Sequence, residues 1–368
     1  MINFVDYIKY TSEPLSLENF TDVDALVLSQ LAYMKFDKIK DGTSFAEMKD
    51  QLDDLVSGTR VAVKNRMMLG YLIQNPRFSS IRVTRYVNEF NWLAVKQLSA
   101  VTFAIDKRFV YVAFRGTDGT IVGWEEDLNM AFMEEVPAQA QAAEYLAEVA
   151  KKHWLSQIIV GGHSKGGNLS VYAAMKQKPR TLKRIQRVYN FDGPEFKQDI
   201  CDLPEYKALQ PKVIKIVPES SIIGMLLERT DHFQIVKAEG ALFFQHDLYN
   251  WTIDENTGDF IRLKELSKAS KNIKSSLYDW LNKFTNDERQ IIIDNLFDIL
   301  NATECTTFNE FIENWKKNSA KLKAQYENTD EPTRELLKKS LVTLAKYLAI
   351  SYLPKKHKRK AITGKNDK

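Results

Sequence analysis

The sequence predicts an α/β protein with a mostly parallel sheet flanked by helices and with a helical extension toward its C-terminal end. Three observations predict this fold class. Several short apolar segments have the continuity of strands that are buried on both faces. Helical segments separate the later strands, and this alternation is typical of a parallel sheet. From about residue 265 onward, amphipathic helical patterns replace the strands.

The first elements are a helix followed by three strands. Residues 21–36 predict a helix, because their apolar side chains fall on one side of it. Residues 80–87 alternate between apolar and polar side chains, as a half-buried strand does. Residues 98–105 and 109–114 are more continuously apolar. They predict two buried strands joined by a tight hairpin.

The central elements alternate. A helix is predicted at about residues 137–154, with a proline in its first turn. The short apolar run at residues 157–160 predicts a buried strand, and a glycine-rich turn and a helix over residues 169–176 follow it. Further strands are predicted at residues 187–191 and 212–217. The order strand, helix, strand places these elements in one α/β domain.

The chain divides into three predicted parts. Residues 1–262 form the α/β domain, residues 263–354 the helical extension, and residues 355–368 a basic tail that is expected to be disordered. Two apolar stripes at helical spacing predict the helices of the extension. Their members are Ile273, Leu277, Trp280, Leu281 and Phe284, and then Leu337, Leu341, Leu344 and Leu348.

The composition excludes several classes of protein. Of the 368 residues, 44% are hydrophobic and 27% are charged, which excludes a disordered chain, a collagen-like repeat and a disulfide-stapled mini-protein. No apolar run reaches the roughly 18 residues of a membrane span. The first residues lack the pattern of a signal peptide. The two cysteines have no metal-binding or redox spacing. We therefore expect a cytoplasmic protein.

The positive charge is concentrated at one end. Residues 355–368 hold seven Lys or Arg and one Asp, a net charge of +6, so the net charge of +4 leaves −2 for the rest of the chain. A nucleic-acid partner is therefore disfavoured. The tail is consistent with a solvated end, or with weak association with an anionic membrane surface.

The motif Gly162-x-Ser164-x-Gly166 predicts a nucleophile elbow. A buried strand precedes it and a helix follows it, which is the setting in which such a serine is exposed at the end of a sheet. The two glycines permit a turn too tight for a side chain. The backbone N–H of Lys165 would then face a developing oxyanion. The alternative is a glycine-rich turn that binds phosphate or has no function.

A second segment fits the same chemistry. Gly116 and Thr117 follow a buried strand, and the N–H of Thr117 could supply the second oxyanion donor. Trp124 and Asp127 come shortly afterwards. The alternative is an ordinary loop with a tryptophan in the core.

These motifs together resemble the class 3 lipases of the α/β-hydrolase fold. The resemblance covers roughly residues 20–255. It rests on Ala113-Phe114-Arg115-Gly116-Thr117, on the pair Trp124 and Asp127, and on Gly162-His163-Ser164-x-Gly166-Gly167. The string Ser164-Lys165-Gly166-Gly167-Asn168-Leu169 is similar to an uncharacterised bacterial lipase-like family. Lys165 stands where the lipases usually carry leucine, and it would place a cation beside the nucleophile, which disfavours a neutral triglyceride.

A nucleophilic serine needs a histidine base. The chain has five histidines, and the order serine, acid, histidine of the α/β-hydrolases leaves His232 and His246 as candidates. His246 follows an apolar segment and precedes Trp251, so its position is better held. We predict His246 as the base, with His232 as the alternative.

Two carboxylates are candidates for the acid that orients the base. Asp192 ends one predicted strand and precedes Gly193-Pro194, and Glu219 follows the next strand. The turn after Asp192 directs its side chain more firmly, so Asp192 ranks narrowly ahead of Glu219. Asp192 could instead cap a turn, and Glu219 could be a solvated loop charge.

The sequence therefore predicts a serine hydrolase that cleaves a carboxylic ester through an acyl-enzyme on Ser164. The substrate would be a small-molecule or lipid ester. No cofactor or metal is implied, because neither metal-ligand spacing nor a dinucleotide motif is present. The alternative is a catalytically silent α/β-hydrolase scaffold that binds a partner through its helices.

Overall fold

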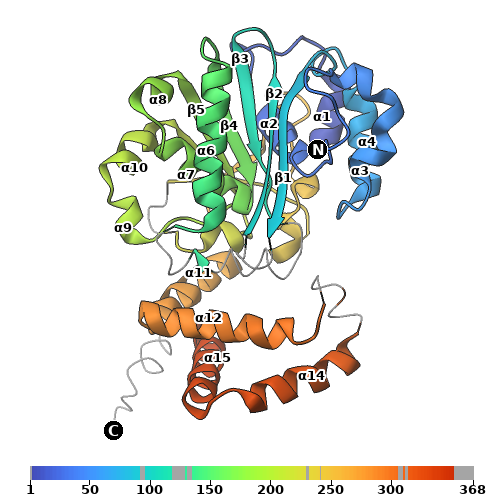
Figure 1. Ribbon diagram of the computed structural model, residues 1–368. Coiled ribbons are helices and arrows are strands. Elements are labelled where there is room, and N and C mark those ends of the chain that lie inside the picture. The colour runs from blue at the N-terminus through green and yellow to red at the C-terminus, as the bar shows by residue number, and fades with distance from the viewer. Residues whose placement is uncertain are drawn as a thin grey trace.

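The computed structural model describes residues 2–91, 96–117, 129–130, 135–228, 232–240, 242–305, 310 and 314–351. These residues form one sheet of eight strands that lie in sequence order from β1 to β8 (Figure 1). The strands are β1 (Arg82–Asn91), β2 (Lys96–Ala104), β3 (Phe109–Phe114), β4 (Gln157–His163), β5 (Ile185–Phe191), β6 (Val213–Pro218), β7 (Gln234–Val236) and β8 (Arg262–Leu263). Strands β3 to β7 pair in parallel, and the outer pairs are antiparallel. The predicted α/β fold class is confirmed.

One face of the sheet is covered by the helices that connect the parallel strands (Figure 1). Crossovers between parallel strands are right-handed, so connections that advance in one direction along the sheet place their helices on the same face. Leu146, Val160 and Leu169 belong to one buried apolar cluster on this face. The helices are α6 (Pro137–Lys152), α7 (Lys165–Met175), α8 (Pro179–Arg184), α9 (Gln198–Cys201) and α10 (Pro204–Leu209).

The opposite face is covered by the N-terminal helices and by the chain around Trp251, whose side chain is buried in the second large apolar cluster. The helices of this layer are α1 (Phe4–Tyr10), α2 (Asp22–Leu31), α3 (Leu52–Val56) and α4 (Ala62–Leu72). The 3-10 helices along the described chain are η1 (Phe45–Gln51), η2 (Gln210–Lys212), η3 (Ile223–Met225), η4 (Leu242–His246) and η5 (Leu248–Asn250). Because both faces are covered, the central strands are buried on both sides, as their apolar composition predicts.

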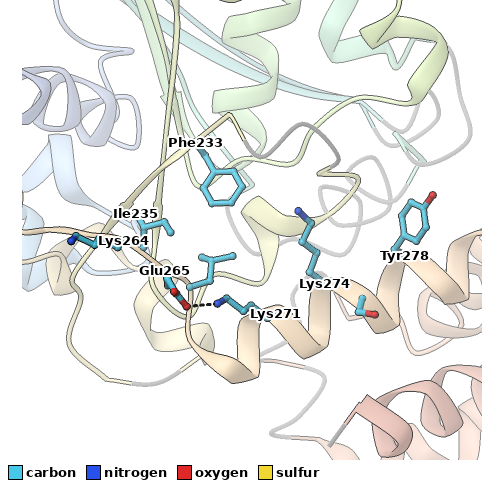
Figure 2. A pocket seen from close by; sticks show the side chains of 9 residues that line it. Phe233, Ile235, Lys264, Glu265, Lys271, Lys274 and Tyr278 are labelled. Carbon is cyan, nitrogen blue, oxygen red and sulfur yellow. Dashed lines mark hydrogen bonds and ion pairs between the residues drawn. The ribbon is translucent and has the colours of Figure 1, made fainter. Parts of the chain in front are cut away.

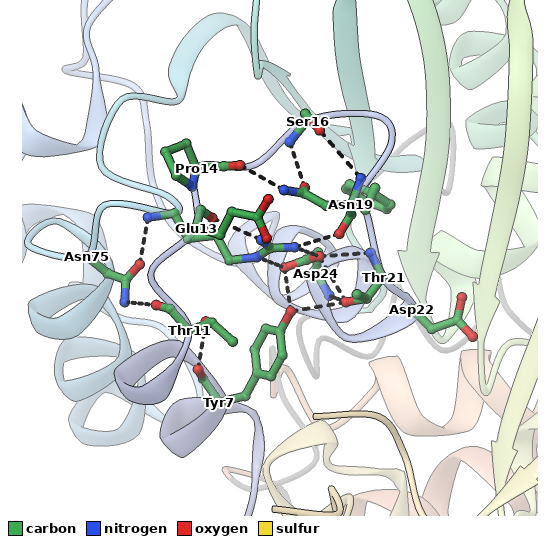
Figure 3. Close-up of polar contacts among 12 residues, drawn as sticks. Tyr7, Thr11, Glu13, Pro14, Ser16, Asn19, Thr21, Asp22, Asp24 and Asn75 are labelled. Atoms are coloured by element: carbon green, nitrogen blue, oxygen red, sulfur yellow. Dashed lines mark hydrogen bonds and ion pairs between the residues drawn. The ribbon is translucent and has the colours of Figure 1, made fainter. Parts of the chain in front are cut away.

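A buried ion pair fixes the N-terminal layer. Arg77 donates from Nε and Nη2 to the two carboxylate oxygens of Asp24, at 2.8 and 2.6 Å. The hydroxyl of Tyr7 donates to the same carboxylate at 3.0 Å. Figure 3 shows how residues from α1, α2 and the segment between them gather around Asp24. Burial and this carboxylate raise the pKa of Tyr7 well above its usual value, so its hydroxyl stays a donor.

The helical extension follows β8. It consists of α11 (Lys268–Leu281), α12 (Asn286–Asn301), α14 (Trp315–Asn328) and α15 (Glu331–Ser351). Phe284, Ile292 and Leu337 form a small apolar cluster of its own. In Figure 1 the extension lies beyond one end of the sheet. The predicted boundary at residue 262 falls inside β8, and the division into domains stays a prediction.

The ends of two elements differ from the prediction by a few residues. The helix expected over residues 21–36 ends at Leu31, while strand β4 continues three residues beyond the predicted end, into the glycine turn. Trp124, Asp127 and the basic tail lie outside the described residues. In the part of the chain that is described, no helix combines the length and the apolar content needed to cross a membrane.

Candidate active site

Ser164 sits on a sharp turn between β4 and α7. Its backbone has φ 57° and ψ −131°, a conformation that costs energy for any residue with a side chain. The turn is held on both sides, because the N–H of Ser164 donates to the carbonyl of Phe191 and the N–H of Gly167 donates to the carbonyl of Ser164, both at 2.9 Å. Such strain is retained where the surrounding structure holds it, and it is often found at functional sites.

The two glycines of the motif are required by close backbone contacts. A Cβ atom on Gly162 would lie 2.3 Å from the carbonyl oxygen of Gly166. A Cβ atom on Gly166 would lie 2.1 Å from the carbonyl oxygen of Phe114, at the end of β3. Both distances are far inside van der Waals contact. The glycine pattern therefore reflects the close approach of β3, β4 and α7 at this turn.

The two predicted oxyanion donors border the turn. Lys165 is the first residue of α7, where the helix dipole places its positive end. Thr117 follows Gly116, whose own Cβ position would lie 3.0 Å from the Cβ atom of Ser164. The segment after β3 therefore runs directly against the serine. The oxyanion roles of Thr117 and Lys165 stay predictions.

The side chain of Lys165 is directed away from solvent. It is only 1% exposed, and its ammonium group donates to the carbonyl of Gln97 on β2 at 3.3 Å. The sequence alone suggested a cation placed beside the nucleophile. The structure instead buries this cation against β2, so an anionic substrate gains no support from an exposed charge at Lys165.

Asp192 and His246 are brought together from positions 54 residues apart in the chain. The imidazole Nδ1 lies 2.7 Å from Oδ2 of Asp192, and the carboxylate is fully buried. Asp192 follows β5 with a φ of 50°, and its N–H donates to the carbonyl of Ile216 on β6. Because a carboxylate accepts, Nδ1 carries the proton in this contact. In the neutral imidazole, Nε2 is then the nitrogen that can accept a hydrogen bond or a proton.

His163 links the serine turn to the loop that carries His246. Its Nε2 lies 2.8 Å from the carbonyl oxygen of His246, which can only accept, so Nε2 is the donor. Its Nδ1 lies 2.9 Å from the hydroxyl of Tyr33, which then donates. The two imidazole rings are 4.5 Å apart between centroids. Burial, with a contribution from the neighbouring His246, holds the pKa of His163 well below its usual value.

The alternative candidates lie elsewhere. Glu219 is partly exposed after β6, and its main chain exchanges hydrogen bonds with Val236 and Ser267. His232 is exposed and precedes β7. The carboxylate found against His246 is that of Asp192. Whether Asp192 and His246 act in catalysis stays a prediction.

Two residues of the site were not predicted from the sequence. The hydroxyl of Ser221 donates to Oδ1 of Asp192 at 2.5 Å, and the N–H of Gly224 donates to the same oxygen at 3.2 Å. Ser221 lies two residues after Glu219, the alternative candidate for the acid, in a loop for which the sequence predicts no other functional residue. No local pattern distinguishes this serine from any other loop serine, because its contact depends on how β5 and β6 lie side by side.

A hollow among the described residues lies beside α11. Its volume is about 530 Å³. Its lining comes from β7 and the residue before it, from the chain after β8 and from α11. It consists of Phe233, Ile235, Lys264, Glu265, Leu266, Lys271, Lys274, Ser275 and Tyr278. In Figure 2, Lys274 points toward the ring of Phe233, with Nζ 5.8 Å from the ring centroid. None of these residues belongs to the predicted site.

Comparison with known structures finds lipases, at low similarity. M37 lipase has a TM-score of 0.39 and 16% identity, over 56% of this chain and 70% of that chain. A mutant form of MDLA from Penicillium cyclopium has a TM-score of 0.40 and 12% identity, over 68% and 87%. A fungal lipase–inhibitor complex has a TM-score of 0.37 and 14% identity, over 66% and 88%. The fold assignment therefore rests on the sheet described above.

Comparison by sequence gives one family. No curated protein matches the chain. A family model described as Mbeg1-like matches residues 72–298, which run from the end of α4 through the sheet and into α12. This match spans well over half of the 368 residues and includes every predicted site residue. The protein therefore belongs to the Mbeg1-like family.

Proposed function

We propose that this protein is a serine hydrolase that cleaves a carboxylic ester through an acyl-enzyme on Ser164. The observation that carries the proposal is the 2.7 Å contact between the buried carboxylate of Asp192 and Nδ1 of His246. The strained turn of Ser164 lies close by in the fold, because its N–H donates to the carbonyl of Phe191, the residue before Asp192. A serine, a histidine and a carboxylate in this relation are the parts of a catalytic triad, whatever their order in the chain.

The mechanism assigns one step to each group. Ser164 Oγ attacks the ester carbonyl while His246 Nε2 accepts its proton, and the N–H groups of Thr117 and Lys165 bind the oxyanion. His246 then returns the proton to the departing alcohol, which leaves the acyl group on Ser164. Water attacks this acyl-enzyme while His246 accepts its proton, and His246 then returns that proton to Ser164 Oγ as the bond to the acyl group breaks and the acid product leaves. Asp192 holds the imidazole in the required tautomer throughout.

Labelling with a fluorophosphonate tests the nucleophile. The wild-type protein is expected to be labelled, and Ser164→Ala is expected to be unlabelled while its circular dichroism spectrum is unchanged. Ser170→Ala is a matched control, because Ser170 is a buried serine of α7, the helix that follows Ser164, and its hydroxyl donates to the carbonyl of Gly166. Equal labelling of wild type and Ser164→Ala would refute the assignment. An unlabelled wild type would favour the silent scaffold that binds a partner through its helices.

A pair of amide substitutions tests the acid. Asp192→Asn is expected to lower the turnover number by about 10⁴-fold, because an amide favours the wrong imidazole tautomer. Glu219→Gln is expected to have a mild effect. The opposite ranking, measured on a panel of esters with graded acyl length, would assign the acid to Glu219.

We also propose that the basic tail supports weak, reversible binding to anionic membrane surfaces, where the ester would be a lipid. The support is the net charge of +6 on residues 355–368. Each basic residue near such a surface contributes about 1 kcal/mol. The full chain is expected to sediment with anionic vesicles at low salt, and a truncation after Pro354 is not. Equal behaviour of the two proteins would contradict this.

A further inference from the structure

We propose that Ser221 is a positioning residue for the Asp192–His246 pair, and that the first turn of α11 holds Ser221 in place. The helical extension would then be part of the framework of the site rather than an appendage. This inference rests on the proposed function insofar as the pair is catalytic, and it is carried by contacts that do not involve Ser164.

The two oxygens of the Asp192 carboxylate have different partners. Oδ1 accepts from the hydroxyl of Ser221 at 2.5 Å and from the N–H of Gly224 at 3.2 Å. Oδ2 accepts from Nδ1 of His246 at 2.7 Å. A carboxylate is planar, so two donors on one oxygen determine where the other oxygen points. Ser221 therefore sets the direction in which Asp192 meets the imidazole.

The loop that carries Ser221 is attached to α11. The hydroxyl of Ser270 donates to the carbonyl of Ser221 at 2.5 Å, and the N–H of Ser267 donates to the carbonyl of Glu219 at 2.7 Å. The hydroxyl of Ser220 donates to that of Ser267 at 3.0 Å. Ser270 and Ser221 are buried, with exposures of 0% and 1%. Burial excludes water as a replacement partner for the bond between Ser270 and Ser221, so this bond holds the loop against the helix.

The same loop also reaches the segment that carries the base. The N–H of Ser220 donates to the side-chain oxygen of Gln245 at 2.8 Å, and Gln245 directly precedes His246. The amide nitrogen of Gln245 donates to the carbonyls of Ala238 and Gly240. A displacement of loop 219–221 would therefore disturb the acid through Ser221 and the base through Gln245.

The extension supplies its own control residue. Ser270 and Ser276 are the two buried residues of α11. Ser276 donates to the carbonyls of Asn272 and Tyr347, both within the extension. Ser276→Ala therefore removes a buried serine hydroxyl from the same helix without removing a contact to the site. Ser270→Ala removes the contact that reaches the Ser221 loop.

Kinetics on the full-length chain give the first readout. Hydrogen bonds to charged groups are among the stronger ones, so Ser221→Ala is expected to lower kcat by about 10- to 100-fold with KM unchanged. Ser270→Ala acts one step further away, and a fall of about 3- to 10-fold in kcat is expected. Ser276→Ala is expected to keep the wild-type kcat. A wild-type kcat in Ser221→Ala, or equal effects of Ser270→Ala and Ser276→Ala, would overturn the proposal.

A spectroscopic readout separates this proposal from the proposed function. The N–H proton in the His246–Asp192 hydrogen bond gives a far-downfield proton NMR signal that His246→Gln would identify by its loss. This signal is expected to broaden or vanish in Ser221→Ala and Ser270→Ala and to persist in Ser276→Ala, whether or not the chain hydrolyses any ester. An unchanged signal in the first two variants would refute the positioning role. If Ser221→Ala does not fold, Ser270→Ala decides by the same two measurements.

Discussion

Helix α7 and helix α14 show how differently the two parts of the molecule are held together. All eleven residues of α7 are buried, whereas of the fourteen residues of α14 only Asn318 is buried. α7 lies between the sheet and its neighbouring helices, so its position follows from burial on all sides. The helices of the extension bury one side at most and depend on a small apolar cluster and a few polar contacts. Removal of one partner of a polar contact should therefore lower the free energy of unfolding more in the α/β domain than in the extension.

Two ion pairs with the same N–O distance of 2.6 Å, one in each part of the molecule, differ in burial in the same way. In the α/β body, Lys215 Nζ lies 2.6 Å from Glu228 and 3.7 Å from Glu195, and all three side chains are buried. In the extension, Lys321 also lies 2.6 Å from its partner Glu304, but their side chains are 31% and 81% exposed. Burial alone would lower the pKa of Lys215, but the two carboxylates outweigh it and the pKa lies above the usual value. A distance alone therefore does not describe an ion pair.

The largest expected effect comes from removing one charge of the buried cluster. Lys215→Met leaves Glu195 and Glu228 buried without their cation, and is expected to lower the free energy of unfolding by about 3–5 kcal/mol. Lys321→Met removes an exposed pair and is expected to cost about 1 kcal/mol or less. Denaturant unfolding of both variants measures the difference. Similar losses in the two variants would mean that burial does not separate the two parts.

A second pair of substitutions lies entirely within the α/β domain. It tests whether the local burial of a residue, rather than its location in this domain, determines how much a substitution changes the stability. Gly162→Ala would press a methyl group against the backbone of Gly166, and such overpacking is expected to cost about 1–3 kcal/mol. Gly70→Ala in α4 meets nothing within 4 Å and is expected to stabilise the protein by about 0.5–1 kcal/mol. Thermal unfolding of both variants shows whether each substitution raises or lowers the stability. Stabilisation by Gly162→Ala would contradict the contacts described at the turn.

The smallest expected effect is the pH dependence contributed by one buried histidine of the α/β domain, whereas residues 263–354 contain no histidine. The pKa of buried His163 is lowered well below 6.5, so the unfolded chain binds its proton first as the pH falls. Stability from this group is therefore constant above about pH 6.5 and declines below it, by at most about 1.4 kcal/mol per pH unit.

Unfolding at pH 7.0 and pH 5.5 checks this prediction. Wild type is expected to lose about 1 kcal/mol more than His163→Gln between the two values. Glutamine can keep one hydrogen bond at this position but cannot titrate. An equal loss in both proteins would place the pH dependence in other groups.

Local patterns predicted most of the sheet. Buried strands such as β3 and the glycine turn around Ser164 could be predicted, because the residues that determine them lie within a few positions of one another. The capping box formed by Thr285 and Glu288 at the start of α12 is local in the same way. The choice between Asp192 and Glu219 was nearly even, because both follow parallel strands whose ends meet at the same edge of the sheet.

The sequence by itself determined the α/β class, the turn that presents Ser164 and a short list of partners for it. The tertiary structure alone decided that Asp192 meets His246 across 54 residues, that Ser270 reaches Ser221 across 49, and that the charge of Lys165 is buried against β2. The physical reason is that periodicity and turn chemistry depend on neighbours along the chain. Contacts between distant side chains depend on which strands lie side by side and on what covers them.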